Sequence, residues 1–457
     1  MPLTDSAGYA VSGASAVSLE AFEQAAYETR CLVDDPVASV DRALAAAPEM
    51  TMAWALKGWL HLLGTEPAGL PIARDCIAAA TALPANERER AHLDGLAKLA
   101  DGRWHAASRM LEDLSVAWPH DALALQVGHQ IDYFTGNARM LRDRIARALP
   151  DWDRGQPGYH ALLGMHAFGL EECGDYEQAE RNGRRSVELE PRDGWGWHAV
   201  AHTMEMRNRA DDGVGWLRPN AEKWSPGSFL AVHNWWHLAL FELELDNVDE
   251  ALCLFDGPIH GARSAVVLDL IDASSMLWRL SLRGVEIGDR WQTVADGWTP
   301  IAGAGSYAFN DLHAMMAFVG SERRDAQRQV LEAQRAVVET GGGNAGFTAG
   351  GDNQAFTRDV GMPACLAFQA FGDGNYAETV RLLRSIRGHA HRFGGSHAQR
   401  DVIDLTLIEA ALRADDTALA TALSNERLAM RPRSPLARLF VQRAARRAEL
   451  APSVAAG

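Results

Sequence analysis

Apolar residues recur along most of this chain at intervals of three and four, and polar residues fill the positions between them. This spacing places the apolar side chains on one face of an α-helix. Short segments such as PGS, CGDY and DGPI interrupt the pattern and mark turns. Extended runs of alternating β-branched residues are absent from the sequence. The pattern therefore predicts an all-α protein built from helices of about 10 to 17 residues.

The middle of the chain carries an internal repeat. Residues 174–179, GDYEQA, and the Glu190-Pro191 pair that follows match the inter-helix turn and the closing proline of a tetratricopeptide repeat. Steps of about 36 residues lead to comparable turns, at Trp104 and Met140 before Tyr176, and at Gly215 and Ala251 after Ala179. We therefore expect tetratricopeptide-like helix pairs that stack into a solenoid and can curl into a closed superhelix. The small residues Ala179, Gly215 and Ala251 would let the paired helices approach closely.

We expect a single helical array over residues 1–457, with a regular and an irregular part. Residues 1–256 fit helix pairs of about 36 residues, and they include the helical segments 38–63 and 73–99. From 257 to 457 the register is lost, and the pattern predicts helices at 268–283, 307–319, 323–340, 363–371, 376–387 and 396–413. The glycine-rich segment 341–362 predicts a long loop, for which a lid over a binding site is favoured over an inert spacer.

Two predicted helices carry titratable residues at helical spacing: His198, His202 and Glu205 on the first, and His233 and His237 on the second. Positions four and seven apart share one face of a helix. In a tetratricopeptide array both segments would be inner-wall helices, so we expect these residues to meet in one polar pocket. The same argument places His166, which lies 36 residues before His202, beside them.

Three interpretations of these histidines stay open. Neutral imidazoles together with Glu205 are suitable ligands for a divalent metal such as zinc, iron, nickel or manganese. Histidines also act as general acid and base near neutral pH, and Glu205 would then fix one tautomer. In the third interpretation the rings are structural and pack against Trp195, Trp197, Trp235 and Trp236. The spacing does not match H-E-x-x-H, so it gives no support to a zinc protease.

Other polar positions would complete the pocket if the array curls. Asp272, Ser275 and Arg279 share a helix face, and Asn310 and His313 lie in an otherwise apolar helix. We expect Asp272, Arg279, Asn310 and His313 to bind substrate. The alternatives are a salt-bridge face for the first set and core hydrogen bonding for the second.

The segment 394–401 opens a predicted helix. Ser396 and Gln399 have the spacing of a capping box. His397 and Arg400 then lie in the first helical turn, where free backbone N–H groups and the positive end of the helix dipole suit an anion. We therefore add His397 and Arg400 to the candidate substrate-binding residues, with a carboxylate or phosphate as the bound group.

Composition and short motifs argue against several other functions. The formal net charge of −16 disfavours a general nucleic-acid binder and docking on an anionic membrane, although the arginine-rich stretches 381–392 and 427–447 could form local basic patches. The five cysteines include no C-x-x-C pair, which fits reduced thiols. The N-terminal residues lack the features of a signal peptide, and no apolar run reaches about 18 residues. We expect a cytoplasmic protein without a nucleophile elbow or a phosphate-binding loop.

Five segments together resemble the tetratricopeptide-repeat protein 38-like family: WHAVAHTMEMRNR (197–209), HNWWHLALFELE (233–244), DASSMLWRLSLRG (272–284), FNDLHAMMA (309–317) and GGSHAQRDV (394–402). The resemblance covers essentially the whole chain. It implies an α-helical repeat protein of the cytosol whose polar motifs belong to one shared site.

The sequence therefore predicts an enzyme or metabolite binder with its pocket on the concave face of the array. The expected chemistry is acid/base or hydrolytic, on a small polar or anionic metabolite. The expected core of the site is His198, His202, Glu205, His233 and His237, which are also the candidate ligands of a divalent metal. The alternative, from another functional class, is a tetratricopeptide scaffold that holds a peptide of a partner protein in its concave groove.

Overall fold

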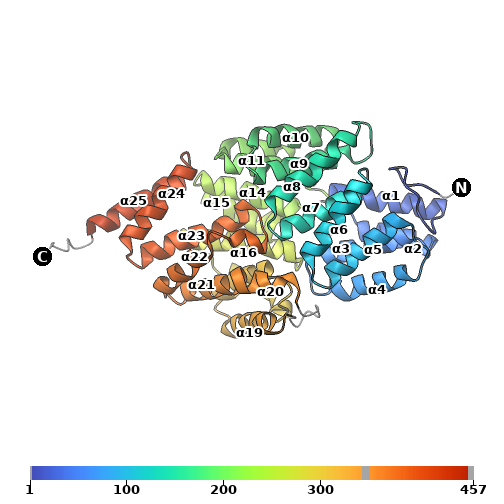
Figure 1. Ribbon diagram of the computed structural model, residues 1–457. Helices are drawn as coiled ribbons and strands as arrows, with labels where there is room; N and C mark the ends of the chain where they lie inside the picture. The colour runs from blue at the N-terminus through green and yellow to red at the C-terminus, as the bar shows by residue number, and fades with distance from the viewer. Residues whose placement is uncertain (1–2, 342–349, 451–457) are drawn as a thin grey trace.

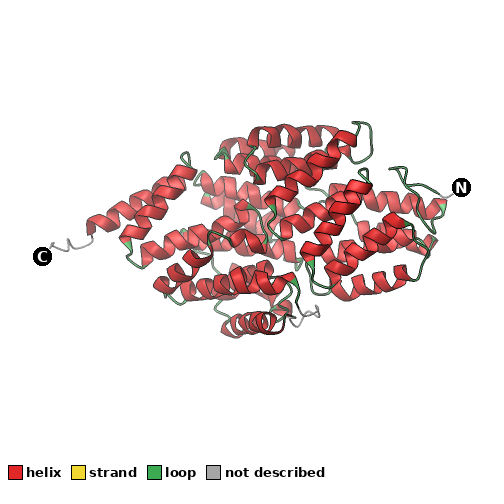
Figure 2. Ribbon diagram, viewed as in Figure 1, coloured by secondary structure: helices red, strands yellow, loops and turns green. Residues whose placement is uncertain are grey.

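The computed structural model describes residues 3–341 and 350–450, and within these ranges the chain is all-helical and contains no extended strand (Figure 1 and Figure 2). The prediction of an all-α protein is therefore confirmed. Figure 1 shows an elongated molecule with the first helices at one end and the last helices at the other. Among the described helices, none is both long and apolar enough to cross a membrane.

Three of the six helices at the N-terminal end have side-chain caps at their starts. Ser15 and Asn86 form capping boxes at α1 and α5, and Asp35 caps α2 through the backbone N–H of Ala38. The helices of this end are α1 (Ala16–Cys31), α2 (Pro36–Ala46), α3 (Thr51–Leu63), α4 (Gly69–Thr81), α5 (Glu87–Ala100) and α6 (Trp104–Ala117).

In the middle of the chain four helices alternate with partner helices that are equally long or shorter. We call these four, and the helices that continue their row, the inner helices. The middle comprises α7 (Ala122–Phe134), α8 (Ala138–Ala148), α9 (Tyr159–Glu172), α10 (Tyr176–Leu189), α11 (Gly194–Met206), α12 (Ala210–Leu217), α13 (Ala221–Trp224), α14 (Ala231–Glu244) and α15 (Val248–Leu254). Helices α7, α9, α11 and α14 begin at residues 122, 159, 194 and 231, so the intervals between them are 37, 35 and 37 residues.

A left-handed residue recurs in the turn after each of these four helices. The residues are Gly136, Gly174, Asn208 and Asp246, with φ between 54° and 84°. Glycine, asparagine and aspartate tolerate this conformation best. In each turn the next backbone N–H returns to a carbonyl of the finished helix, as from Asp175 to Leu170 at 2.9 Å. Each of these four helices thus ends in the same way, with a left-handed turn residue that the local sequence favours.

The C-terminal part confirms the predicted helices to within one residue at each end. It contains α16 (Val267–Leu282), α17 (Arg290–Trp298), α18 (Ala308–Gly320), α19 (Arg324–Thr340), α20 (Asp352–Phe356), α21 (Met362–Gly372), α22 (Tyr376–Ile386), α23 (His397–Arg413), α24 (Thr417–Met430) and α25 (Pro435–Leu450). Of these, α17, α20, α24 and α25 were not predicted. Two of them, α24 and α25, carry the arginine-rich stretch 427–447.

The prediction of a long loop over 341–362 is wrong for its second half. Helix α20 continues through a π-turn (Thr357–Gly361) directly into α21, and residues 342–349 lie outside the described part of the chain. Asp352 accepts a hydrogen bond from the backbone of His105, and Asn353 accepts one from the backbone of Ala308, both at 2.9 Å. Most of the glycines precede Asp352, so the residues after it are free to form helix.

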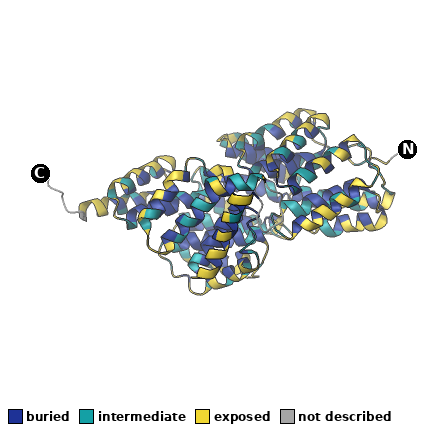
Figure 3. Cartoon of the chain, turned by 60° about the horizontal axis from the view of Figure 1, so that its bottom comes forward, coloured by how far each residue is buried: buried dark blue, intermediate teal, exposed yellow. Residues whose placement is uncertain are grey.

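The inner helices pack side by side in chain order. Helix α9 contacts α11, α11 contacts α14, α14 contacts α16, and α16 contacts α18. Helix α23 returns from the C-terminal part to pack on α16 and α11. The buried faces of these helices form the interior of the molecule, with exposed residues on the outside (Figure 3). Helices α11 and α14 are therefore enclosed by elements that are distant in sequence.

Of the three small residues that we expected to let paired helices approach closely, one is misplaced by two positions. Ala179 and Ala251 are fully buried, as expected, but Gly215 is exposed and an added Cβ there would meet nothing within 4 Å. The close approach occurs at Gly213, where an added Cβ would lie 2.3 Å from the ring of Phe241. Gly213 is 34 residues after Ala179, so the error comes from assuming a constant interval of 36.

Candidate metal centre

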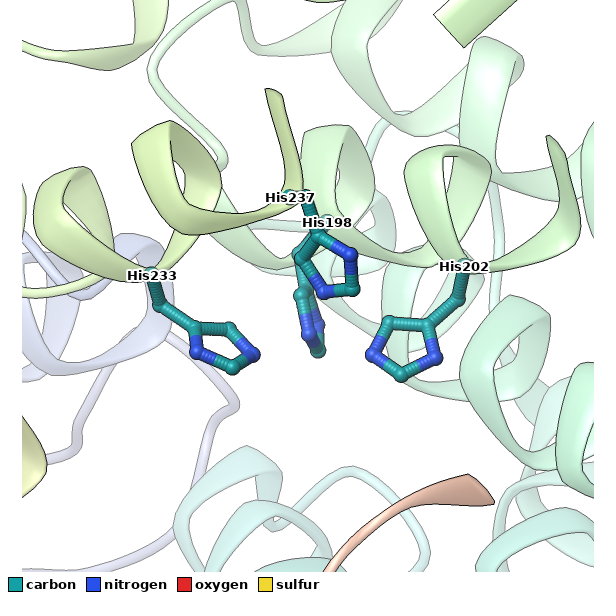
Figure 4. Close-up of side chains that lie close together, drawn as sticks. All are labelled: His198, His202, His233 and His237. Atoms are coloured by element: carbon teal, nitrogen blue, oxygen red, sulfur yellow. The ribbon is translucent and has the colours of Figure 1, made fainter. Parts of the chain in front are cut away.

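Four histidines on α11 and α14 point into one space between the helices (Figure 4). His198 and His202 are one turn apart on α11, and His233 and His237 are one turn apart on α14, because residues four apart share a helix face. Asp193 caps α11 by accepting hydrogen bonds from the first backbone N–H groups. Two adjacent helices therefore position all four rings.

We call His198, His202, His233 and His237 the histidine tetrad. One side-chain nitrogen of each ring lies within 4.8 Å of the corresponding nitrogens of the others. The ring centroids are 4.4 Å apart for His198 and His202, 4.5 Å for His202 and His237, and 4.9 Å for His233 and His237. The structure thus brings together the histidines that the sequence places on two inner helices.

Two tetrad rings are oriented by carboxylates at close range. Nδ1 of His233 lies 2.8 Å from Oδ1 and 2.9 Å from Oδ2 of Asp272, which comes from α16. Nδ1 of His237 lies 3.0 Å from Oε2 of Glu205, which comes from α11. Donation of Nδ1–H to a carboxylate leaves Nε2 with its lone pair free. Both rings therefore present Nε2 as their available donor atom.

A third carboxylate lies beside the tetrad, and the sequence argument missed it. Oε2 of Glu171 on α9 is 3.6 Å from Nδ1 of His202, slightly longer than a hydrogen bond. Glu171 is fully buried, and neither of its oxygens has a hydrogen-bond partner in the described protein. Burial, with help from the neighbouring carboxylates, raises the pKa of Glu171 well above its usual value. This shift favours the neutral acid form of Glu171.

The sequence did contain a signal for Glu171. Glu171 lies three residues before the left-handed Gly174, and Glu205 lies three residues before the left-handed Asn208. The two glutamates are thus equivalent when helices are aligned on their closing turns. The fixed interval of 36 residues aligned Glu171 with Arg207 and concealed the match.

The tetrad is buried, and the protein supplies few hydrogen-bond partners for its ring nitrogens. None of its side chains belongs to a residue more than 4 % exposed. Burial, together with the neighbouring rings, lowers the pKa of His198, His202 and His237 well below the usual histidine value. Both nitrogens of His198, both of His202 and Nε2 of His237 lack a hydrogen-bond partner among the described residues. An unsatisfied buried polar group costs about 1–3 kcal/mol, so the rings present unused donor atoms at a substantial energetic cost.

The donor set fits a transition metal. Neutral imidazole nitrogen is a preferred ligand of zinc, copper, iron and nickel. Zinc–nitrogen bonds of about 2.0–2.1 Å place tetrahedral donors about 3.4 Å apart. With the tetrad donors within 4.8 Å of one another, each distance would have to shorten by at most about 1.4 Å.

Aromatic packing explains part of the arrangement. The ring of His233 stacks on Trp236 at 5.2 Å, and the ring of His198 lies 4.9 Å from Trp195. Trp197 instead packs on Trp216, and Trp235 on Trp224. Packing of this kind orients the rings but satisfies none of their nitrogens, so it does not account for the unpaired donor atoms.

The predicted substrate-binding residues separate into different places. Asp272 joins the tetrad through His233, whereas Arg279 lies over the ring of Trp236 and donates to the carbonyls of Ser275 and Ala398. Burial lowers the pKa of Arg279 to about 10. Asp272 and Arg279 therefore lie in different environments, although they share one face of α16.

The residues Asn310 and His313 on α18 have their own structural partners. The side-chain amide of Asn310 donates to Thr65, and Nδ1 of His313 donates to the carbonyl of Phe309 at 2.8 Å. Neither belongs to the groups of potential metal ligands found in the described residues. Core hydrogen bonding, the alternative considered for this pair, describes their contacts.

The anion at the start of α23 is supplied by the protein itself. The predicted capping box of Ser396 and Gln399 is confirmed. The backbone N–H of His397 donates to Oε1 of Glu172 at 2.8 Å, and a guanidinium nitrogen of Arg400 lies 3.4 Å from Oε2 of the same residue. The expectation that this helix start binds a ligand anion is corrected accordingly, because Glu172 on α9 occupies the position.

His166 does not join the tetrad, contrary to the expectation from its spacing. Its Nδ1 lies 3.0 Å from the side-chain amide of Asn182 on α10. The interval from α9 to α11 is 35 residues, so a position 36 residues before His202 is rotated by about 100° around its helix.

A cleft of about 430 Å³ adjoins the site. Its lining includes Glu205, Arg279 and Asp401, and it continues to Arg431 on the loop before α25. Glu205 connects the cleft with the tetrad, since one of its oxygens contacts His237 and the residue itself lines the cleft.

No known protein-family model matches this chain. The residues themselves therefore carry the functional argument.

Proposed function

We propose that the protein is a metal-dependent enzyme that hydrolyses a small polar or anionic metabolite. The observation that supports this proposal is the histidine tetrad, in which carboxylates from α9, α11 and α16 lie behind three of four buried imidazoles. Metal-ligating histidines almost always donate their second N–H to a carboxylate, a carbonyl or water. His233 and His237 show that feature, and a third carboxylate, Glu171, lies 3.6 Å from Nδ1 of His202. Core packing alone does not readily explain three carboxylates placed around rings that face one space.

The carboxylates suggest a role for each ring. His202, His233 and His237, which have a carboxylate beside Nδ1, are the proposed ligands. Three protein ligands leave one position for water or substrate, as in catalytic zinc sites. A bound divalent cation would supply Lewis-acid activation of water. His198, kept neutral by burial, would hydrogen-bond that water at one of its two unpaired nitrogens.

Metal-free acid/base catalysis agrees less well with the electrostatics. Efficient proton transfer requires a group whose pKa lies near the working pH. Burial lowers the pKa of His198, His202 and His237 well below that range, so these rings are poor general acids at neutral pH. The neutral imidazole, which a low pKa favours, is the form that binds a metal.

The cleft beside Glu205 suits a small molecule better than a peptide. Its volume of about 430 Å³ lies within the range of metabolite and drug pockets, about 300–1,000 Å³. An extended peptide of several residues needs a longer groove. The scaffold function therefore remains the second candidate.

The repeat pattern supports a finer proposal for the fold. We infer that the helix pairs form a tetratricopeptide-like solenoid, because the inner helices recur at 37, 35 and 37 residues and end in the same left-handed turn. An experimental structure in which the pairs α9–α10 and α11–α12 fail to superpose would contradict it.

The proposed function is tested first by elemental analysis of protein purified without a metal-affinity tag. We expect about one transition-metal ion per chain. The variant His202→Ala/His237→Ala should lose it, and His129→Gln should retain it. His129 is the matched control because it is equally buried but bonds to the carbonyl of Met165.

A second variant separates the role of the three proposed ligands from that of His198. His198→Gln should keep the metal but lose hydrolytic activity in a screen of esters, amides and phosphate esters. Absence of metal from wild-type protein, even after incubation with zinc followed by desalting, would sink the proposal. Metal retained by the double variant would show that it binds elsewhere.

A further inference from the structure

The cleft beside Glu205 is lined by more cations than anions. Seven arginines and five carboxylates contribute to its wall, together with several leucines and phenylalanines. The helices that form it are α11, α14 and α16 on one side and α23 to α25 on the other. A cleft that combines excess positive charge with apolar surface selects ligands that have both an anionic group and a hydrocarbon body.

Most of the arginines already have partners. Arg427 forms a bidentate pair with Asp401 at 2.8 and 3.0 Å, and Arg413 and Arg443 both bind Glu409. The Arg427–Asp401 and Arg443–Glu409 pairs each tie α23 to another helix of the wall, and the Arg413–Glu409 pair lies within α23. They neutralise one another and leave little attraction for a ligand.

Arg431 is not paired in this way. Its nearest carboxylate oxygen in the described structure is Oε1 of Glu205, at 4.0 Å, and its hydrogen-bond contact is the sulfur of Met206 at 3.8 Å. The residue is only 8 % exposed, so its charge is poorly hydrated. An arginine in such surroundings gains strongly from a bidentate carboxylate.

An apolar wall begins beside Arg431. Leu436, Leu439 and Phe440 on α25 face Leu240 and Leu405 across the cleft. Leu439 lines the cleft and is 46 % exposed. The hydrocarbon body of a ligand would cover it.

We infer that this cleft binds a monocarboxylate carried on an apolar body, with the carboxylate on Arg431 and the body against the α25 wall. This position places the ligand next to Glu205, and through it next to His237. The inference rests on the proposed function only in naming this ligand as substrate or product. Binding to Arg431 requires no metal.

The test is calorimetric titration of full-length protein with 4-phenylbutyrate, in metal-free and zinc-loaded form. The uncharged analogue 4-phenylbutan-1-ol is the second probe. We expect the carboxylate to bind at least tenfold more tightly than the alcohol in both forms. Arg431→Gln should remove that preference, and Arg384→Gln, the same charge change at an exposed site on α22, should leave it intact.

A second variant protects the test against misfolding of Arg431→Gln. Leu439→Asp alters an exposed position, so it should fold, and it should weaken 4-phenylbutyrate binding at least fivefold. Equal binding of alcohol and carboxylate, no detectable binding, or unchanged affinity in both variants would overturn the inference. Carboxylate binding that depends on zinc would also overturn it, because the anion would then sit on the metal. Binding to a protein that takes up no metal would uphold this inference while refuting the proposed function.

Discussion

Replacement of Asp272 by asparagine separates a metal-supporting role from a structural one. Both carboxylate oxygens of Asp272 lie within 2.9 Å of Nδ1 of His233, and the residue is fully buried. Asparagine has nearly the same shape and keeps one oxygen that can accept the Nδ1–H. The substitution therefore removes the negative charge and leaves the ring in place.

The expected loss follows from the role of such partners in metal sites. Removing a carboxylate behind a ligating histidine typically lowers metal affinity 10- to 100-fold. This range corresponds to about 1.4–2.7 kcal/mol of binding free energy. Burial raises the pKa of Asp272, which indicates that its charge is held at a cost in the metal-free protein. We therefore expect the metal-free variant to melt at the same temperature as wild type or higher.

The assay is zinc competition against a fluorescent chelator at pH 7.4, with the melting temperature of the metal-free protein measured in parallel. Asp121→Asn is the matched control, because Asp121 also contacts a buried histidine, with Oδ2 2.9 Å from Nε2 of His92, outside the tetrad. The control should leave zinc affinity unchanged. Zinc affinity within threefold of wild type in Asp272→Asn, together with a lower melting temperature, would show that Asp272 is only a core hydrogen-bond partner.

Three further predictions concern protons and packing. Burial raises the pKa of Glu171 and favours its protonated form in the metal-free protein. Zinc uptake in weakly buffered solution at pH 7 should therefore release more protons from wild type than from Glu171→Gln, as read with a pH dye. Folding lowers the pKa of His198, so protonation of the unfolded chain destabilises the folded protein as the pH falls below about 6.5. Between pH 7.5 and 5.5, the free energy of unfolding of the metal-free wild type, measured in urea, should fall by about 1.4 kcal/mol more than that of His198→Gln. On α12, Gly213→Ala should destabilise the protein by about 1–3 kcal/mol against the Phe241 ring, whereas Gly215→Ala should stabilise it by about 0.5–1 kcal/mol in the same unfolding assay. Equal proton release, parallel pH curves or equal effects of the two alanines would contradict these arguments in turn.

The sequence by itself determined the helices and much of their ends. Apolar spacing predicted α16, α18, α19, α21, α22 and α23 to within one residue. The capping box at Ser396 and the turn glycine at Gly174 act within a few residues of themselves, so a reader of the sequence can find them. The same holds for the paired histidines of α11 and α14, since a spacing of four places two rings on one face whatever surrounds them.

The tertiary structure decided which groups meet across helices. Asp272 and Glu171 reach the tetrad from α16 and α9, and Glu172 occupies the start of α23, where the sequence suggested a ligand. Of these three residues only Glu171 has a signal in the sequence, its position three residues before Gly174, and that signal does not say which ring it meets.

The physical reason is the rotation of about 100° that each residue adds around a helix. Inner helices recur after 37, 35 and 37 residues, so a fixed period drifts by a residue between neighbours. That drift turned His166 toward Asn182 and moved the close approach from Gly215 to Gly213. Local periodicity thus fixes what each helix offers, while the packing of successive helices selects which of those side chains share a site.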